Sequence, residues 1–183
     1  GSQIWLKEGE TMTVDELPVI VHTAKQGEQV VGYAVETMTT KGFSGVFRLM
    51  VGFRASGEVY NINVLEHSET PGLGSKMGDE GNSLLVSFKD KNPANMKQPL
   101  AVVKDGGDVQ ALTAATISSR AYVDAVVRAY NAVQQIKGGA NVATGATSNS
   151  TEWSEGEPAA EQTTAEEATE TVNEETQKGE DNE

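Results

Sequence analysis

Two short segments of the sequence combine residue types that could hold a phosphate or a planar ligand. The first crowds hydroxyl-bearing and small side chains together: Thr113, Ala114, Ala115, Thr116, Ile117, Ser118 and Ser119. It stands at the entrance to a long helical pattern, so its amides would lie where a helix lacks intrahelical acceptors. A phosphate there would meet these donors and the positive end of the helix dipole. A Thr/Ser-rich helix cap with a purely structural role is the alternative interpretation.

The second segment, residues 66–76, follows a strand pattern directly. Pro71-Gly72 suits the central positions of a type II turn, because proline presets φ and glycine accepts φ > 0. Gly74 leaves the backbone open for close approach by a planar ligand. Leu73, between two glycines, would be exposed at such a turn unless it packs on something. An ordinary loop that ends a strand is the alternative here.

The other residue types that often carry chemistry predict no second site. The chain has no cysteine, which excludes thiol catalysis, cysteine-ligated iron–sulfur clusters and disulfides. His22 and His67 stand without the spacing of metal ligands, so we expect a structural or surface role for each. We predict no metal site and no catalytic acid–base pair.

The elements that must position the two segments indicate an α+β fold. Strand-like stretches between Gly-containing turns are 17–24, 30–39, 45–55, 58–65, 84–88 and 99–104. One helix is predicted over 119–137, where an apolar stripe comprises Tyr122, Val126, Ala129, Tyr130, Val133 and Ile136. Ser118 or Ser119 would cap its start, and Gly138-Gly139 its end. We therefore predict an antiparallel strand meander covered by a long C-terminal helix.

The formal net charge of −13 is concentrated at the C-terminal end of the chain. Residues 151–183 hold 12 acidic residues and 1 basic residue, whereas the other 150 residues have a net charge of −2. From residue 139 onward large apolar residues are almost absent, so we expect 3–138 to be one domain and 139–183 a disordered acidic tail. That tail is either an interaction segment or a solvated extension. Neither part offers the basic face that nucleic-acid binding requires.

The N-terminus gives little information on membrane attachment. No apolar run approaches the roughly 18 to 20 residues that a membrane helix needs. We interpret Gly1-Ser2 as a vector-derived remnant, which leaves room for a targeting or anchoring segment that has been removed.

Both segments resemble, in order and spacing, a single family: the G subunits of Rnf electron-transport complexes, with their FMN-binding domain. The C subunit of the sodium-translocating NADH:quinone reductase is a more distant resemblance. The similarity runs from about Gly32 to Tyr130. It includes Gly42-Phe43-Ser44-Gly45, Arg48-Leu49-Met50-Val51-Gly52, Val64-Leu65-Glu66-His67, Glu69-Thr70-Pro71-Gly72-Leu73-Gly74 and Thr113-Ala114-Ala115-Thr116-Ile117-Ser118.

The resemblance implies a covalently attached cofactor. In this family FMN is joined through a phosphoester to the last threonine of a Ser/Thr-Gly-Ala-Thr motif, which falls on Thr116. The amides of 115–119 and the hydroxyls of Thr113, Ser118 and Ser119 would then hold the phosphate. The loop 69–76 would lie against the isoalloxazine ring, with Thr70 and Leu73 as its main contacts and 43–45 nearby. The residues assigned to the cofactor there are Glu69, Thr70, Gly72, Leu73, Gly74, Lys76 and Ser44.

The chain departs from the family pattern at two positions. The glycine of the motif is Ala114 here, and the acidic residue three positions before the motif falls on Gln110, with Asp108 two places away. The enzyme that attaches the flavin, a flavin transferase that uses FAD, acts on this segment.

The function implied by the resemblance is electron transfer at a membrane. We expect an extracytoplasmic subunit of an ion-translocating ferredoxin:NAD oxidoreductase, with the other membrane subunits as partners and an N-terminal anchor absent here. The equivalent subunit of a sodium-translocating NADH:quinone reductase is one alternative. A flavin-free extracytoplasmic binding or structural module of the same fold is the other.

Overall fold

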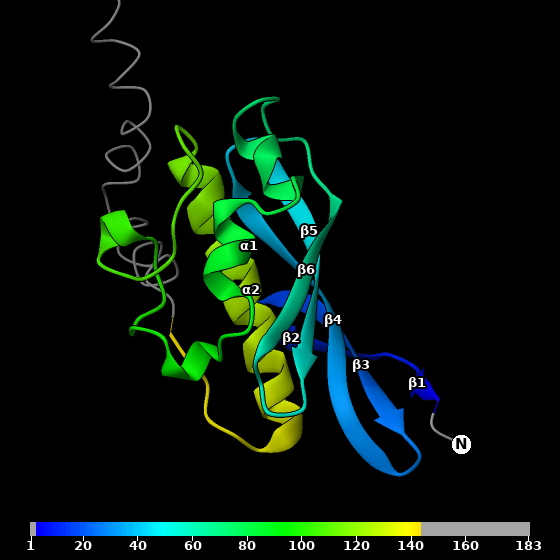
Figure 1. Cartoon of the computed structure of the whole chain (residues 1–183). Coiled ribbons are helices and arrows are strands. Elements are labelled where there is room, and N and C mark those ends of the chain that lie inside the picture. The colour runs from blue at the N-terminus through cyan, green and yellow to red at the C-terminus, as the bar shows by residue number, and fades with distance from the viewer. Residues whose placement is uncertain (1–2, 144–183) are drawn as a thin grey trace, which may run out of the picture.

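The computed structural model describes residues 3–143, in which a six-stranded antiparallel sheet packs against one long helix (Figure 1). The predicted α+β class and the helix-covered meander are confirmed. The strands are β1 (Ile4–Leu6), β2 (Glu10–Val14), β3 (Leu17–Gln26), β4 (Gln29–Gly42), β5 (Gly45–Arg54) and β6 (Val59–Glu66). Most of the segment predicted as a disordered acidic tail, from residue 144 onward, lies outside the described residues.

Strands β3 to β6 form the predicted meander, in which each strand pairs with the next. The order across the sheet is β1-β3-β4-β5-β6, and β2 also pairs with β3. Side chains alternate between the two faces of a strand. In β5 the core-facing set, all buried, is Phe47, Leu49, Val51 and Phe53, whereas Val46 is exposed. The four strands predicted between residues 17 and 65 therefore correspond to β3, β4, β5 and β6.

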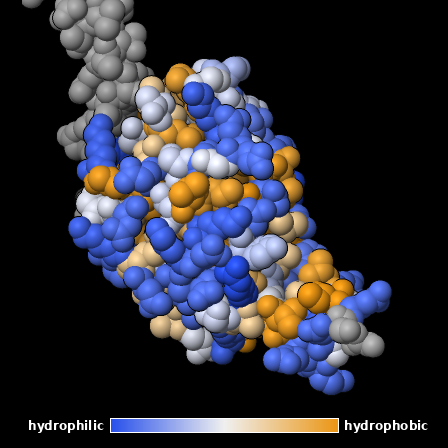
Figure 2. All heavy atoms as spheres, viewed as in Figure 1, coloured by the Kyte–Doolittle hydropathy of each residue, from blue (hydrophilic) through white to orange (hydrophobic). Residues whose placement is uncertain are grey.

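An N-terminal extension of the sheet, strands β1 and β2, was not predicted. Strand β2 pairs with β3 through a two-residue turn at Asp15 and Glu16, whose φ angles are +52° and +72°. Hairpin turns of this kind usually carry Asn-Gly or Asp-Gly, so Asp-Glu gives no hairpin signal. The three residues of β1 are all exposed, and Figure 2 shows apolar atoms gathered at that end of the molecule.

The segment predicted as a strand over 84–88 is instead a helix, α1 (Ser83–Phe88). A short apolar run does not distinguish strand from helix, and here the preceding residue decides. The Asn82 side chain accepts hydrogen bonds from the amides of Leu84 and Leu85, as a helix N-cap does. Leu84 and Phe88, four positions apart, are then both buried on one face.

The strand predicted over 99–104 is also wrong. In place of a strand, single bridge residues form at Leu100 and between Val102 and Val109, next to the short 3-10 helix η3 (Val103–Asp105). Gly106, at φ +96°, then reverses the chain. A second 3-10 helix, η2 (Pro93–Asn95), precedes this loop. Among residues 3–143 no strand follows β6, so residues 99–104 form single bridges instead of a continuous ladder there.

The long helix α2 (Thr116–Lys137) lies between the sheet and the 83–112 segment (Figure 1). Of its predicted apolar stripe, all members are buried except Ile136, which is 36% exposed. The opposite face, with Asp124, Val127 and Arg128, is buried too. Within the stripe, Tyr122 stacks on Phe88 of α1 with ring centroids 6.3 Å apart. Helix α2 is therefore more deeply buried than a single stripe indicates, and its buried side chains include the polar residues Asp124, Arg128 and Asn131. It ends, as predicted, at Gly138, with φ +78°.

A buried ion pair fastens α2 to the sheet. Arg128 and Asp124 are 3% and 1% exposed, and the guanidinium donates to the carboxylate at 2.8 Å. Arg128 also donates to the carbonyl oxygens of Val14 in β2 and Met38 in β4, at 2.9 and 2.8 Å. The Thr39 hydroxyl donates to Asp124 at 2.9 Å. One side-chain cluster thereby connects α2 to two strands.

The packed domain continues past the boundary expected at residue 138. Asn131 exchanges two hydrogen bonds with the backbone of Val142, at 3.0 and 2.8 Å. The amide of Leu100 donates to the carbonyl oxygen of Ala143 at 2.9 Å. Residues 139–143 thus return along the helix and cover part of the core.

Candidate functional site

The two segments singled out in the sequence, 66–76 and 112–119, meet at one end of the molecule (Figure 1). The contact is close at Gly74, the first residue of the 3-10 helix η1 (Gly74–Gly78). A Cβ at this position would lie 2.5 Å from Ser118 Oγ and 2.9 Å from Glu69 Cβ. Glycine is therefore required where the loop meets the first turn of α2.

The loop contains the turn that its sequence predicts. The Leu73 amide donates to the Thr70 carbonyl oxygen at 3.0 Å, which closes the turn, and Gly72 has φ +80°. Pro71 and Gly72 therefore occupy the positions expected for a type II turn. Ser75 Oγ accepts from the Gly72 amide at 3.0 Å. Leu73 is 39% exposed at the surface beside this turn.

Helix α2 begins three residues earlier than predicted, at Thr116. The N-cap residue is Ala115, and no side chain caps the helix, so the prediction of a Ser118 or Ser119 cap is wrong. The amides of Thr116, Ile117 and Ser118 find no acceptor among the described residues. Three donors at the positive end of a long helix form an anion-binding arrangement.

The hydroxyl groups around the helix start divide into two kinds. Ser118 and Ser119 are buried, and their hydroxyls already bind protein: Ser118 Oγ donates to Glu69, and Ser119 Oγ donates to the Ala115 carbonyl oxygen at 2.8 Å. Thr113 is exposed and Thr116 is half-buried. The threonine hydroxyls are thus the accessible ones, whereas Ser118 binds the Glu69 side chain and Ser119 binds the backbone.

Ala114 occupies a backbone conformation that favours glycine. The Ala115 amide donates to the Leu112 carbonyl oxygen at 3.2 Å, which closes a turn, and Ala114 has φ +58° within it. An L-residue with a Cβ meets a steric penalty of about 1–2 kcal/mol in this region. The glycine of the family motif falls on this position, and the backbone gives the physical reason for it.

Ala114→Gly is therefore expected to raise the free energy of unfolding by about 0.5–1 kcal/mol, because it removes the Cβ penalty at φ > 0. Urea denaturation of the two flavin-free chains measures the change. Ala111→Gly, in the same loop but without a positive φ, is the matched control and should lower stability. A loss of stability in Ala114→Gly would contradict this account of the turn.

Glu69 is the buried acid of the site, with 4% of its surface exposed. Its carboxylate accepts hydrogen bonds from the amides of Phe43 and Ser44, at 3.1 and 3.0 Å, and from the Ser118 hydroxyl. Phe43 and Ser44 form the turn between β4 and β5, so this turn belongs to the same cluster. The Phe43 side chain is 53% exposed there, and only its place in the resembling motif marked it in the sequence.

Two basic side chains near the start of α2, Lys76 and Arg120, differ in whether their charge is already paired with an acid among residues 3–143. Lys76 in η1 is exposed. Arg120, on the second turn of α2, instead forms a two-pronged ion pair with Asp105, at 2.7 and 2.8 Å. Lys76 is thus the predicted site residue whose charge lies at the surface.

The two histidines have structural partners. His67 Nδ1 accepts from the Glu69 amide at 3.0 Å, and His22 contacts Glu36 at 3.4 Å. Within residues 3–143, no group of three or more histidine or acidic side chains could hold a metal ion. The expected structural role of both residues agrees with these contacts.

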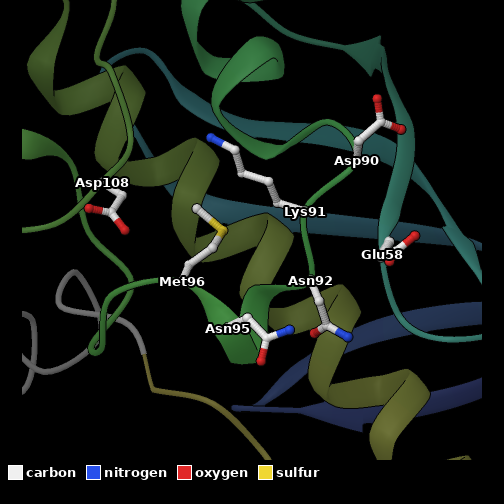
Figure 3. A pocket seen from close by; sticks show the side chains of 7 residues that line it. All are labelled: Glu58, Asp90, Lys91, Asn92, Asn95, Met96 and Asp108. Carbon is white, nitrogen blue, oxygen red and sulfur yellow. The ribbon is translucent and has the colours of Figure 1, made fainter.

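A polar depression of about 510 Å³ is lined by none of the predicted site residues (Figure 3). Several of its polar groups bind protein: Asn92 accepts from the Tyr130 hydroxyl at 3.1 Å, and Asp108 accepts from the Lys97 amide at 2.9 Å. Its lining comprises Glu58, Asp90, Lys91, Asn92, Asn95, Met96 and Asp108. None of these residues belongs to the two segments that meet at the start of α2.

Comparisons with known proteins bear on this cluster. Residues 42–131 match the FMN-binding domain family, a range that contains every predicted site residue. The chain is 38% identical over 136 residues to the G subunit of the ion-translocating oxidoreductase complex of Shewanella loihica, covering 72% of this chain and 64% of the relative. The corresponding protein of Haemophilus influenzae (strain KW20 / Rd) is 39% identical over 110 residues, covering 59% and 53%. The chain thus spans less than two thirds of the length of these relatives.

Proposed function

The chain belongs to the FMN-binding domain family, and from this premise we propose that it is an electron-transfer subunit of an ion-translocating oxidoreductase complex. FMN is the cofactor of the family, and in this chain it is joined through its phosphate to Thr116. One observation carries the proposal: Thr116 stands at the first position of α2, half-buried, beside three amides that find no acceptor among the described residues. That donor set fits a phosphate.

The start of α2 serves as the phosphate end of the site. The amides of Thr116, Ile117 and Ser118 would donate to the phosphate oxygens, together with the exposed Thr113 hydroxyl. The hydroxyls of Ser118 and Ser119 act indirectly, since they hold the turn and the loop in place. The phosphate is thereby fixed on a rigid element whose remaining length is buried.

The loop 69–76 serves as the ring end of the site. When bound, FMN supplies reversible uptake and release of electrons. Leu73 and Phe43 present exposed apolar side chains from the two segments that Glu69 joins, and would shield the isoalloxazine from water. Thr70, Gly72, Gly74, Ser44 and Lys76 would complete these surroundings.

Attachment requires one phosphoryl-transfer step, in which FAD is the donor. Thr116 Oγ forms a bond to the phosphorus of the FMN half of FAD, and the pyrophosphate bond of FAD breaks. AMP leaves, and the hydroxyl proton of Thr116 is lost to solvent or to a base of the flavin transferase. The chain gains the mass of FMN less one water.

Co-expression with a flavin transferase tests the proposal. Intact-mass measurement is expected to show that increment, and yellow colour should persist after denaturation because the link is covalent. Material made without the transferase is the control and should have the unmodified mass. An unmodified chain, under conditions in which the G subunit of one of the relatives becomes flavinylated, would support a flavin-free module of the same fold instead.

The whole-complex function extends beyond this domain. We propose that the chain works on the extracytoplasmic side of a membrane, carrying electrons in a ferredoxin:NAD oxidoreductase with other membrane subunits as partners. The two relatives described above are G subunits, which favours this complex over the quinone-reductase alternative. Within residues 3–143, no helix has both the length and the apolar character of a membrane span.

A further inference from the structure

We propose that Glu69 is a positioning residue that locks the two ends of the FMN site together before the flavin arrives. This inference rests on the proposed function, since it concerns the same site. Glu69 belongs to the loop at the ring end, and its carboxylate is bound by Ser118 at the phosphate end. It also binds the turn between β4 and β5. The side chain therefore acts through its neighbours and does not serve as a flavin ligand.

All the hydrogen-bond partners of the carboxylate come from distant parts of the chain. Oε1 accepts from the Phe43 amide at 3.1 Å and from the Ser118 hydroxyl, and Oε2 accepts from the Ser44 amide at 3.0 Å. Glu69 itself is 4% exposed, so the carboxylate end of these bonds is shielded from water. A buried charge in this setting is stabilised only while its donors stay in place, so it holds the three segments in one arrangement.

Two glycines let these segments approach the carboxylate. A Cβ on Gly74 would lie 3.1 Å from Glu69 Oε1, and a Cβ on Gly42 would lie 3.0 Å from Glu69 Oε2. Backbone from the loop and from the end of β4 thus packs against opposite oxygens of one carboxylate. The backbone of Glu69 is also held in place, because His67 Nδ1 accepts a hydrogen bond from the Glu69 amide at 3.0 Å.

The chemistry of the cluster requires a carboxylate and rejects an amide. Glutamine at position 69 would place its NH₂ group against either the Phe43 amide or the Ser44 amide, depending on its orientation. Two donors would then face each other, and one of these two backbone amides would lose its acceptor. Ser118 tolerates either orientation, since a hydroxyl can donate or accept. Glu69→Gln therefore preserves the shape of the side chain but removes one of its two hydrogen bonds with the β4–β5 turn.

The decisive experiment compares three variants of the full chain: Glu69→Gln, Ser118→Ala and the matched control Glu66→Gln. Glu66 lies three residues earlier, with its side chain 67% exposed and paired with Arg48. The first measurement uses flavin-free protein and follows hydrogen exchange of individual amides. The second measures the initial rate of FMN attachment by a flavin transferase with saturating FAD.

In Glu69→Gln, exchange at whichever of the Phe43 and Ser44 amides loses its acceptor should accelerate at least about tenfold, while amides in the middle of α2 keep their protection. The rate of attachment should fall at least about tenfold, because Thr116 and the loop no longer hold one geometry. Ser118→Ala should slow attachment while leaving the turn amides protected. Glu66→Gln should match wild type in both measurements.

Wild-type exchange and attachment rates in Glu69→Gln would overturn the inference, as would a uniform loss of protection that includes α2. If Glu69→Gln fails to fold, Ser118→Ala decides, and an unchanged attachment rate in that variant would overturn the inference. If wild type takes no FMN, the proposed function fails, and the exchange measurement still decides whether Glu69 clamps the turn.

Discussion

Thr116→Ala is expected to abolish covalent attachment of FMN while leaving the domain folded. The variant removes the only atom that forms the phosphoester, Oγ of Thr116. The Thr116 hydroxyl makes no hydrogen bond that another described residue depends on, and alanine is a good residue for a helix. Intact mass after co-expression with a flavin transferase measures attachment, and thermal unfolding measures the fold.

Two variants of neighbouring hydroxyls separate this role from general damage to the segment. Thr113→Ala, at an exposed position three residues earlier, removes one proposed phosphate donor but keeps the nucleophile, so it should keep the mass increase at a lower rate of attachment. Thr116→Ser should keep it as well, more slowly, because the nucleophilic oxygen is retained. Covalent flavin on the Thr116→Ala chain would refute the assignment of the attachment residue.

Arg128→Met should lower the free energy of unfolding by about 3–5 kcal/mol, the loss expected when one partner of a buried ion pair is removed. The substitution leaves the Asp124 carboxylate buried and takes the donor from two carbonyl oxygens, those of Val14 and Met38. Denaturation of the flavin-free chain measures the change. Arg54→Met is the control, because the Arg54 side chain is 41% exposed and pairs with Glu58 at the surface. It should lower the free energy of unfolding by about 1 kcal/mol or less.

The pH dependence of this loss follows from the pKa of Asp124. Burial acts to raise the pKa, but Arg128, Lys41 and the Thr39 hydroxyl outweigh it, so the pKa in the folded chain is lowered. The resulting stabilisation is present above the unfolded pKa of about 3.9 and is lost as the pH falls through the folded value. The difference between wild type and Arg128→Met should therefore shrink in acid. If the two free energies of unfolding differ by the same amount at every pH, or by less than about 1 kcal/mol, the buried pair does not stabilise the docking of α2 on the sheet.

The fold could be predicted from the sequence where local patterns decide it. The meander β3–β6 has alternating apolar residues and Gly-containing turns, and α2 has a clear periodicity. The hairpin at Asp15-Glu16 lacks the usual turn residues, and the run 84–88 became a helix through the Asn82 cap. The second buried face of α2, with Asp124 and Arg128, depends on side-chain contacts with β2 and β4, which no local pattern reveals.

The candidate site was predicted as two segments, and the structure brings them together. The sequence could not reveal that Ser118 and Ser119 bind protein or that Glu69 joins three segments. Such contacts depend on tertiary packing between residues 26 and 49 positions apart. The conformation of Ala114 was hidden as well, because alanine rarely adopts positive φ and gives no turn signal.

These side-chain contacts join residues far apart in the sequence, and this affects when the flavin can be attached. Hairpins between successive strands close short loops, whereas the bond from Arg128 to Val14 spans 114 positions. Contacts of such sequence separation form late, since closing long loops costs entropy before packing compensates for it. The start of α2 therefore reaches Glu69 only when the sheet and helix have docked. An attaching enzyme that requires this geometry will modify only chains that have finished folding, so the flavin content of a preparation will report its natively folded fraction.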